Sequence, residues 1–306
     1  MFAKKVILMF LLFLSYKSKA QKNLTSLVIL GIAQDGGSPQ IGCDKSCCKI
    51  LWENNLFESV TSIGLIDNLE NRFFLIDASP DITKQYNMLK SLTSNASLGG
   101  IALTHAHIGH YSGLFFLGKE SLDAKSINVY SMPKMSFFLE NNGPWSQLIQ
   151  EKNIVLNKLK NDSIQTLSKY ISIKPIIVPH RDEFSETVGY LIKGEFKSAL
   201  FLPDIDKWEK WNKKIEDFIK NVDYAFIDGT FYNGKELPNR NMNEIPHPFV
   251  VETLDRFKNL KKRDKKKVYF IHLNHTNPLL KPNNKITKQI IKKGYNIART
   301  GMKFNL

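Results

Sequence analysis

The sequence of 306 residues is poor in cysteine, with only three. An odd number of thiols cannot pair completely within one chain, and the count excludes a small scaffold held together by disulfides. Three interpretations stay open: a structural zinc, one disulfide beside a free thiol, or three reduced thiols. A structural zinc would need a fourth ligand, which the sequence around Cys43, Cys47 and Cys48 does not identify.

The sequence also lacks an apolar run long enough to span a bilayer core of about 30 Å. Its N-terminal run, residues 6–14, has nine apolar residues, follows Lys4 and Lys5, and precedes the small-x-small ending Ser18-Lys19-Ala20. This pattern is typical of a secretory signal peptide, with a short buried helix as the alternative. We therefore expect residues 1–20 to be removed and the protein to be exported, to the periplasm or out of the cell.

No linker, repeat or low-complexity tract interrupts the chain beyond residue 22, so residues 21–306 are expected to form a single domain. The formal net charge of +14 indicates a loose attraction to anions. The basic block 256–267 belongs to no recognisable nucleic-acid-binding module, and no specific nucleic-acid partner is predicted. The expected partner is a small-molecule substrate, and the oligomeric state is left undetermined.

Short β-type runs alternate with amphipathic stretches along the chain, which predicts a mixed α/β fold. The predicted strands are 27–32, 61–66, 72–76, 101–103, 173–178, 199–202, 224–227 and 268–271. The predicted helices are 81–92, 206–221, 248–257 and 284–293.

Imidazole and carboxylate side chains follow five of these predicted strands. They are His105, His180, Asp204, Asp228 and His272. Strands that lie side by side gather such residues along one edge of a sheet. Imidazole plus carboxylate is a ligand set for Zn²⁺, with iron or manganese as alternatives.

The segment His105-Ala-His107-Ile-Gly109-His110 has a spacing suited to two neighbouring ions. His105 and His107 are two residues apart, so they point to the same side of an extended chain. His110 comes three residues later, where a helix can begin and turn its ring back. One short segment can therefore provide two rings to one metal and a third ring to an adjacent site.

On these residues the chain resembles the metallo-β-lactamase superfamily. The superfamily motif, His-x-His-x-Asp-His followed by a distant His, an Asp and a last His, is matched by His105, His107, His110, His180, Asp204 and His272. The chain further resembles the branch of pyrroloquinoline quinone biosynthesis protein B in segments 30–40, 201–206, 227–231, 272–278 and 300–304. The resemblance implies a four-layer αββα sandwich of two mixed β-sheets flanked by helices.

The resemblance also implies two sets of metal ligands. The first set is His105, His107 and His180, and the second is His110, Asp204 and His272, with Asp204 as the bridging carboxylate. Gly109 departs from the motif, because the family has there the Asp that binds the second ion. His275 stands where the branch more often has Asn, which makes it a candidate for the missing ligand. The cluster Cys43, Cys47 and Cys48 also resembles that branch, in which such cysteines can hold a structural zinc.

Three other residues are candidates for roles near the metal. Asp35, in the glycine-rich first loop, is a candidate to face the metal and handle a proton, with a plain turn residue as the alternative. Asp228 is a candidate to orient an imidazole. His247, between two prolines, is expected to line the pocket.

These residues predict an exported metal-dependent hydrolase using one or two Zn²⁺ ions, in which a metal-activated water attacks an ester, amide or phosphoester. Asp204 and Asp35 are its predicted catalytic carboxylates. The alternative is a metal-dependent oxygenase or cofactor-biosynthesis protein like the quinone branch, with oxygen rather than water activated. A further alternative is a non-catalytic metal-binding protein, whose metal would be closed by four protein ligands.

Overall fold

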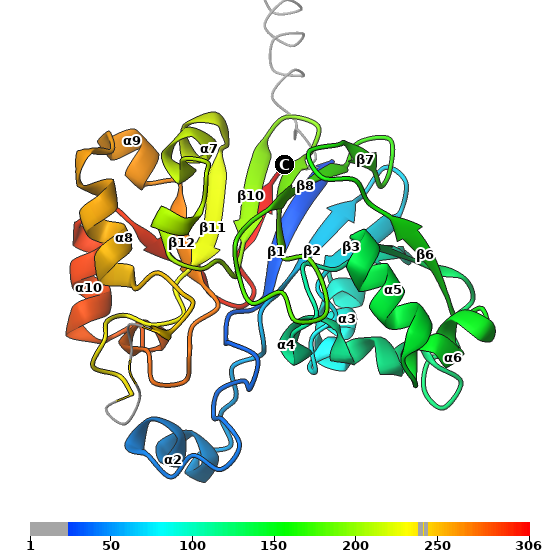
Figure 1. The fold of residues 1–306 in the computed structure, drawn as a ribbon, viewed down its shortest axis with the longest axis horizontal. Coiled ribbons are helices and arrows are strands. Elements are labelled where there is room, and N and C mark those ends of the chain that lie inside the picture. The colour runs from blue at the N-terminus through cyan, green and yellow to red at the C-terminus, as the bar shows by residue number, and fades with distance from the viewer. Residues whose placement is uncertain (1–23, 238–240, 242–243) are drawn as a thin grey trace, which may run out of the picture.

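The computed structural model describes residues 24–237, 241 and 244–306 (Figure 1). The predicted signal peptide therefore lies outside the described residues. Among the described residues, no helix combines the length and the apolar character needed to cross a membrane.

Two mixed sheets of seven strands each form the centre of the described chain. In order across the first sheet, the strands are β14 (Lys303–Asn305), β1 (Thr25–Gly31), β2 (Ser62–Asp67), β3 (Arg72–Ile76), β4 (Ser97–Ala102), β5 (Ile127–Ser131) and β6 (Ile154–Lys158). The second sheet runs β13 (Asn296–Ile297), β12 (Val268–Ile271), β11 (Tyr224–Asp228), β10 (Ser198–Leu202), β9 (Val188–Lys193), β8 (Ser172–Ile177) and β7 (Gln165–Thr166).

Helices cover the outer side of each sheet (Figure 1). Beside the first sheet lie α3 (Ile82–Ser91), α4 (Ile108–Tyr111), the 3₁₀ helix η2 (Ser112–Leu117), α5 (Pro133–Asn141) and α6 (Trp145–Gln150). Beside the second lie α7 (Ile215–Asn221), α8 (Val250–Arg256), α9 (Lys262–Lys265) and α10 (Lys285–Lys292), with the 3₁₀ helices η3 (Trp208–Lys210), η5 (Phe257–Asn259) and η6 (Pro278–Leu280). The helix α2 (Ser46–Glu53) stands apart from both sheets.

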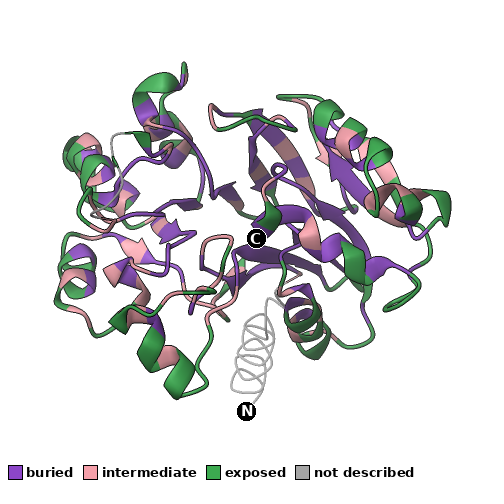
Figure 2. Ribbon diagram, turned by 60° about the horizontal axis from the view of Figure 1, so that its bottom comes forward, coloured by how far each residue is buried: buried purple, intermediate pink, exposed green. Residues whose placement is uncertain are grey.

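Both faces of the central strands are buried, which explains their nearly continuous apolar sequence. In β1, Leu27 and Ile29 join the core between the two sheets, whereas Val28 and Leu30 join the core under the helices of the first sheet. This alternation follows from the two-residue period of a strand. Figure 2 shows the result, with buried strands inside and exposed helix faces outside. The predicted αββα sandwich of two mixed sheets flanked by helices is confirmed.

Each predicted strand corresponds to an observed one, but the helix predicted over 206–221 was wrong. It is divided into η3 and α7. The chain is extended at Trp211, where the indole donates a hydrogen bond to the carbonyl of Ile177 at 3.1 Å. Burying this indole against β8 interrupts the helical path.

The pairing of the strands brings the chemical residues to one edge. Strands β10, β11 and β12 are parallel neighbours, and β3 is parallel to β4 in the other sheet. Parallel neighbours end on the same side, so the residues that follow them lie close together. The residues at these strand ends, or just after them, are Asp77, His105, Asp204, Asp228 and His272.

Candidate metal centre

Asp204 lies at the middle of a group of histidines drawn from both sheets. Its Oδ2 is 3.1 Å from Nε2 of His110 and 3.3 Å from Nε2 of His272. The same oxygen is 3.8 Å from Nε2 of His105, and Oδ1 is 3.7 Å from Nε2 of His180. The structure thus brings Asp204 and these predicted ligands into one cluster, as the proposed bridging role requires.

The ligand atoms fall into overlapping groups whose members lie within 4.8 Å of one another. His105, His107 and His180 form one group, which is the predicted first site. His110 and His272 form another together with Asp35, whose Oδ1 is 3.3 Å from Nε2 of His110. Asp204 lies between the two groups.

A divalent metal fits these residues, because several of their buried polar atoms have no hydrogen-bond partner among the described residues. These atoms are Nε2 of His105, both ring nitrogens of His180, Oδ2 of Asp204 and Oδ1 of Asp35. Leaving a buried polar atom unpaired costs about 1–3 kcal/mol. Five such atoms at one place point to an absent partner, and nitrogen and carboxylate oxygen are the donors that Zn²⁺ prefers.

Asp77 and Thr104 orient two of the rings. Nδ1 of His110 donates to Oδ2 of Asp77 at 2.7 Å, which fixes the ring with Nε2 turned toward Asp204. The Thr104 hydroxyl donates to the same carboxylate at 2.9 Å, so it accepts from Nδ1 of His105 at 3.0 Å. Sequence reasoning missed Asp77, although it follows predicted strand 72–76 as the other site residues follow theirs.

Asp228 and Thr230 make a matching arrangement in the second sheet. The Thr230 hydroxyl donates to Oδ1 of Asp228 at 2.8 Å and accepts from Nδ1 of His272 at 3.0 Å. Nδ1 of His247 donates to Oδ2 of Asp228 at 2.7 Å. The structure therefore places Asp228 where it orients imidazoles, as predicted, with Thr230 as an intermediary that the sequence did not identify.

Burial and neighbouring charges shift the pKa values of the histidines in opposite directions. Burial lowers the pKa of His180 to about 4 and the pKa of His105 well below its usual range. Burial opposes protonation of His110 too, but the Asp77 charge and the contacts with Asp204 and Asp35 raise its pKa well above normal. For His247, the charge of Asp228 likewise outweighs burial and raises the pKa.

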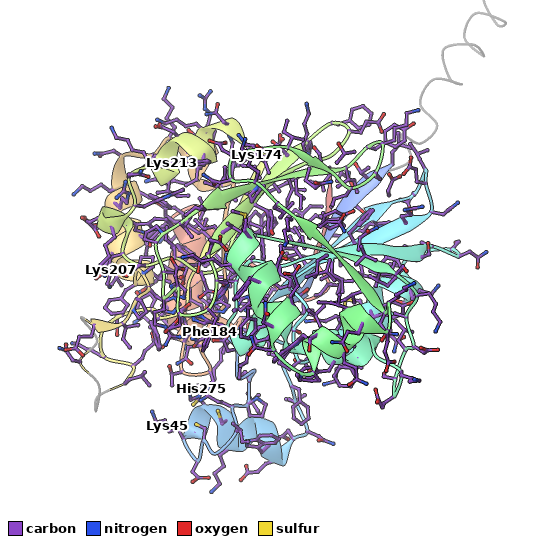
Figure 3. All side chains as sticks on the ribbon, turned by 45° about the vertical axis from the view of Figure 1, so that its right-hand side comes forward. Lys45, Lys174, Phe184, Lys207, Lys213 and His275 are labelled. Carbon is purple, nitrogen blue, oxygen red and sulfur yellow. The ribbon has the colours of Figure 1, made fainter. Side chains whose placement is uncertain are left out.

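The structure corrects the prediction for His275, which does not join the second site. Its Nδ1 is 3.2 Å from Sγ of Cys48 and 3.7 Å from Sγ of Cys47. Figure 3 shows His275 beside the segment that carries Lys45 and leads into α2. The turn after β12 places His272 at the metal centre and directs His275, three residues later, toward α2.

Cys43, Cys47, Cys48 and His275 form a four-ligand group within 4.8 Å, which supplies the fourth ligand that the sequence left open. All three thiols are free, and the 3.9 Å between Sγ of Cys47 and Sγ of Cys48 is far from the roughly 2.05 Å of a disulfide. A tetrahedral zinc with Zn–S bonds of about 2.3 Å holds its sulfurs about 3.8 Å apart. The group therefore fits a structural zinc.

A cavity of about 510 Å³ opens beside the metal centre. Apolar side chains of Ile41, Ile108, Phe231, Leu237 and Ile245 line it, together with Asp35, Arg181, His247 and the amides of Gln34, Gln40 and Asn274. His247 thus lies on the cavity wall, as predicted. Another cavity, of about 570 Å³, lies between β8, β9 and α7, and none of the predicted site residues lines it.

Comparison with protein families gives a match to the model described as the Beta-lactamase superfamily domain over residues 72–273. Among curated proteins, the chain is 22% identical to coenzyme PQQ synthesis protein B of Methylorubrum extorquens (strain PA1), covering 92% of this chain and 99% of the relative. It is 24% identical to coenzyme PQQ synthesis protein B of Pseudomonas entomophila (strain L48), with coverage of 91% and 99%.

Solved structures show the same fold. Zinc-bound PqqB from Methylobacterium extorquens has a TM-score of 0.78 at 19% identity, covering 92% of this chain and all 100% of that chain. A diphosphatase from the PhnP family has a TM-score of 0.66 at 20% identity, with coverage of 92% and 96%. Human tRNase Z, short form, has a TM-score of 0.58 at 14% identity, with coverage of 91% and 98%.

Proposed function

Because the chain belongs to the β-lactamase superfamily and resembles PQQ synthesis protein B within it, we propose that it is a metal-dependent hydrolase. The observation that carries this proposal is the cluster of buried ring nitrogens and carboxylate oxygens around Asp204 that have no hydrogen-bond partner in the described part of the chain. His105, His107 and His180 would hold one ion, and His110 and His272 would hold a second, with Asp204 shared. When bound, a metal such as Zn²⁺ supplies a water with a pKa lowered from 15.7 to about 7 and polarises a carbonyl or phosphoryl oxygen.

His247 is suited to deliver a proton to the leaving group. Its Nδ1 is held by Asp228 at 2.7 Å, so Nε2 is the nitrogen that is free to donate. The charge of Asp228 outweighs the effect of burial and raises the pKa of His247, which favours the protonated acid. Because His247 lines the cavity beside the cluster, its proton is available at the place where a substrate would bind.

Arg181 indicates what the substrate carries. Its guanidinium is 3.3 Å from Nε2 of His107 and forms part of the cavity wall. The apolar side chains of Ile41, Ile108 and Phe231 line the same cavity. We propose that Arg181 binds an anionic or strongly polar oxygen near the scissile bond while the apolar wall binds a hydrocarbon part of an ester or phosphoester.

The test is a panel of carboxylic esters, lactones and phosphodiesters assayed with metal-depleted and metal-restored protein. We expect turnover that returns with zinc, manganese or iron and disappears in Asp204→Asn. Asp162→Asn is the control, because this carboxylate pairs with Lys174 and Lys213 on the surface. Turnover that survives complete metal removal, or that is unchanged in Asp204→Asn, would refute the proposal.

A second candidate function is a step of quinone-cofactor biosynthesis. It is favoured by the match to PQQ synthesis protein B over 99% of that protein and by the shared fold of the zinc-bound PqqB structure. In this case an iron ion would support oxygen-dependent chemistry at the same ligands. Anaerobic assays of the iron-loaded protein distinguish the candidates, because loss of turnover without oxygen supports this function and unchanged turnover excludes it.

We also propose that the protein is exported, on the strength of residues 1–20 alone. Cell fractionation and N-terminal sequencing of the native protein test this. Cleavage near Ala20 supports export, whereas an intact N-terminus on protein recovered with the cytosol contradicts it.

A further inference from the structure

Position 109 lacks the carboxylate that the superfamily motif provides, and the structure shows another carboxylate in its place. We propose that Asp35, in the turn after β1, is the ligand of the second metal site that substitutes for the missing residue 109. This inference rests on the metal centre of the proposed function and assigns one of its ligands.

The position of Asp35 satisfies the geometry of such a ligand. Its Oδ1 is 3.3 Å from Nε2 of His110 and 4.0 Å from Nε2 of His272. Oδ2 of Asp204 is 3.1 and 3.3 Å from the same two nitrogens. Both imidazoles therefore face both carboxylates, which together form a nitrogen and oxygen donor set suited to zinc, manganese or iron.

Hydrogen bonds within the turn do not explain the position of the Asp35 carboxylate. A turn aspartate ordinarily accepts hydrogen bonds from nearby backbone N–H groups. Oδ1 of Asp35 is buried and accepts no hydrogen bond from any described residue. It is turned toward Nε2 of His110, 3.3 Å away, and Nε2 of His272, 4.0 Å away, where a bound cation would compensate its charge.

Gly109 makes room for this arrangement. A Cβ atom at position 109 would lie 2.2 Å from Oδ1 and 2.7 Å from Cα of Asp35, and both distances are well inside van der Waals contact. A side chain at position 109 and the observed Asp35 loop therefore exclude each other. The space taken by a residue-109 side chain in the family motif is occupied here by Asp35.

The backbone before Asp35 is fixed on both sides, so the carboxylate is delivered at a defined place. The amide of Gln34 donates to the carbonyl of Leu273 at 2.9 Å, and the amide of Leu273 donates to Ile32 at 2.7 Å. On the other side, the amide of Ala33 donates to the carbonyl of Ser59 at 3.0 Å. Because Leu273 follows His272 directly, the same contacts set Asp35 and His272 next to each other.

The experiment is a Co²⁺ titration of the metal-depleted full chain, followed by absorption spectroscopy and by metal analysis. Thiolate-to-cobalt bands report the site of Cys43, Cys47, Cys48 and His275, whereas ligand-field bands without sulfur report the histidine centre. We expect Asp35→Asn to lose one sulfur-free equivalent, with its affinity reduced on the order of 100-fold or more, while the thiolate bands are unchanged.

Two further variants complete the test: the first controls for general damage, and the second displaces Asp35 without changing its side chain. Glu183→Gln removes a carboxylate 3.5 Å from Nε2 of His107 that is half exposed, and we expect it to keep the wild-type number of ions. Gly109→Ala inserts the Cβ that displaces Asp35, and we expect it to weaken the same equivalent as Asp35→Asn. Thermal unfolding of each variant shows whether it is folded before metal is added.

Unchanged binding of every equivalent by folded Asp35→Asn would overturn the assignment, and so would a wild-type centre that binds only one ion. Neither outcome depends on turnover. A wild-type protein that takes up two sulfur-free ions without hydrolysing any substrate would instead refute the proposed hydrolysis and leave the assignment of Asp35 intact.

Discussion

Replacing Asp77 by Asn tests how far the orientation of the metal ligands depends on residues behind them. Asp77 is fully buried and accepts from Nδ1 of His110 at 2.7 Å, from the amide of Thr104 at 2.8 Å and from its hydroxyl at 2.9 Å. An Asn amide can replace the oxygen on one side only. The NH₂ group of the Asn side chain would face a donor in either orientation, the ring N–H of His110 or the hydroxyl of Thr104. One of these two hydrogen bonds is therefore lost or reversed.

The size of the effect follows from the charged character of that contact. A hydrogen bond to a charged group contributes about 1.5–3 kcal/mol, and 1.4 kcal/mol corresponds to a tenfold change in a binding constant. Loss of the His110 contact alone therefore weakens metal binding at Asp204 and His110 by about 10- to 100-fold, which agrees with the general cost of removing a residue that orients a ligand.

Isothermal titration of metal-depleted Asp77→Asn with Zn²⁺ measures this change. Asp67→Asn is the matched control, because Asp67 is also fully buried and accepts from Leu69, Glu70 and Ser168, away from the metal centre. Both variants are expected to unfold at lower temperature, but only Asp77→Asn should lose metal affinity. Equal affinity in Asp77→Asn and wild type, or an equal loss in both variants, would refute the reasoning.

Three other substitutions separate the remaining roles. His247→Gln is expected to lower kcat by about 10²–10⁴-fold with little change in KM, most strongly for substrates with basic leaving groups. An equal loss for a p-nitrophenyl ester, whose leaving group is weakly basic, would contradict proton donation. Arg181→Gln should raise KM for anionic substrates about 10-fold or more and leave neutral esters nearly unchanged, which a paired kinetic comparison measures; equal effects on both would argue against charge recognition. Cys48→Ser should abolish the thiolate-to-cobalt bands and lower the unfolding temperature of the zinc-loaded protein. Without metal, the wild type and the variant should unfold at nearly the same temperature. A variant that still holds one zinc tightly at that site would count against the structural zinc.

Eight of the fourteen described strands, and the main metal ligands, followed from local sequence pattern; β5, β6, β7, β9, β13 and β14 were not predicted. Runs such as 224–227 and 268–271 are apolar and β-branched or aromatic, and such runs form buried strands. Residues that end these strands, Asp204 and His272 among them, arrive at a common edge wherever the strands are parallel neighbours. The same rule applied after strand 72–76 would have identified Asp77.

The assignments that failed or stayed open depended on contacts across long sequence separations. Position 275 was a candidate for the second site because it stands where the related branch more often has Asn. Three residues of turn nevertheless carry its ring to Cys48, 227 positions away. The role of Asp35 was open between a turn residue and a proton carrier. Its carboxylate is held against His110 by backbone pairing with distant segments, of Gln34 with Leu273 and of Ala33 with Ser59.

By itself, the sequence determined which side chains are available for metal chemistry and that most of them stand at strand ends, because strand period and strand termination are local properties. The tertiary structure decided how these side chains are distributed. It separated His275 from His272, filled the space at Gly109 with Asp35, and paired Asp77 and Asp228 with particular rings. Each of these depends on how two distant segments pack, and local pattern carries no information about that packing.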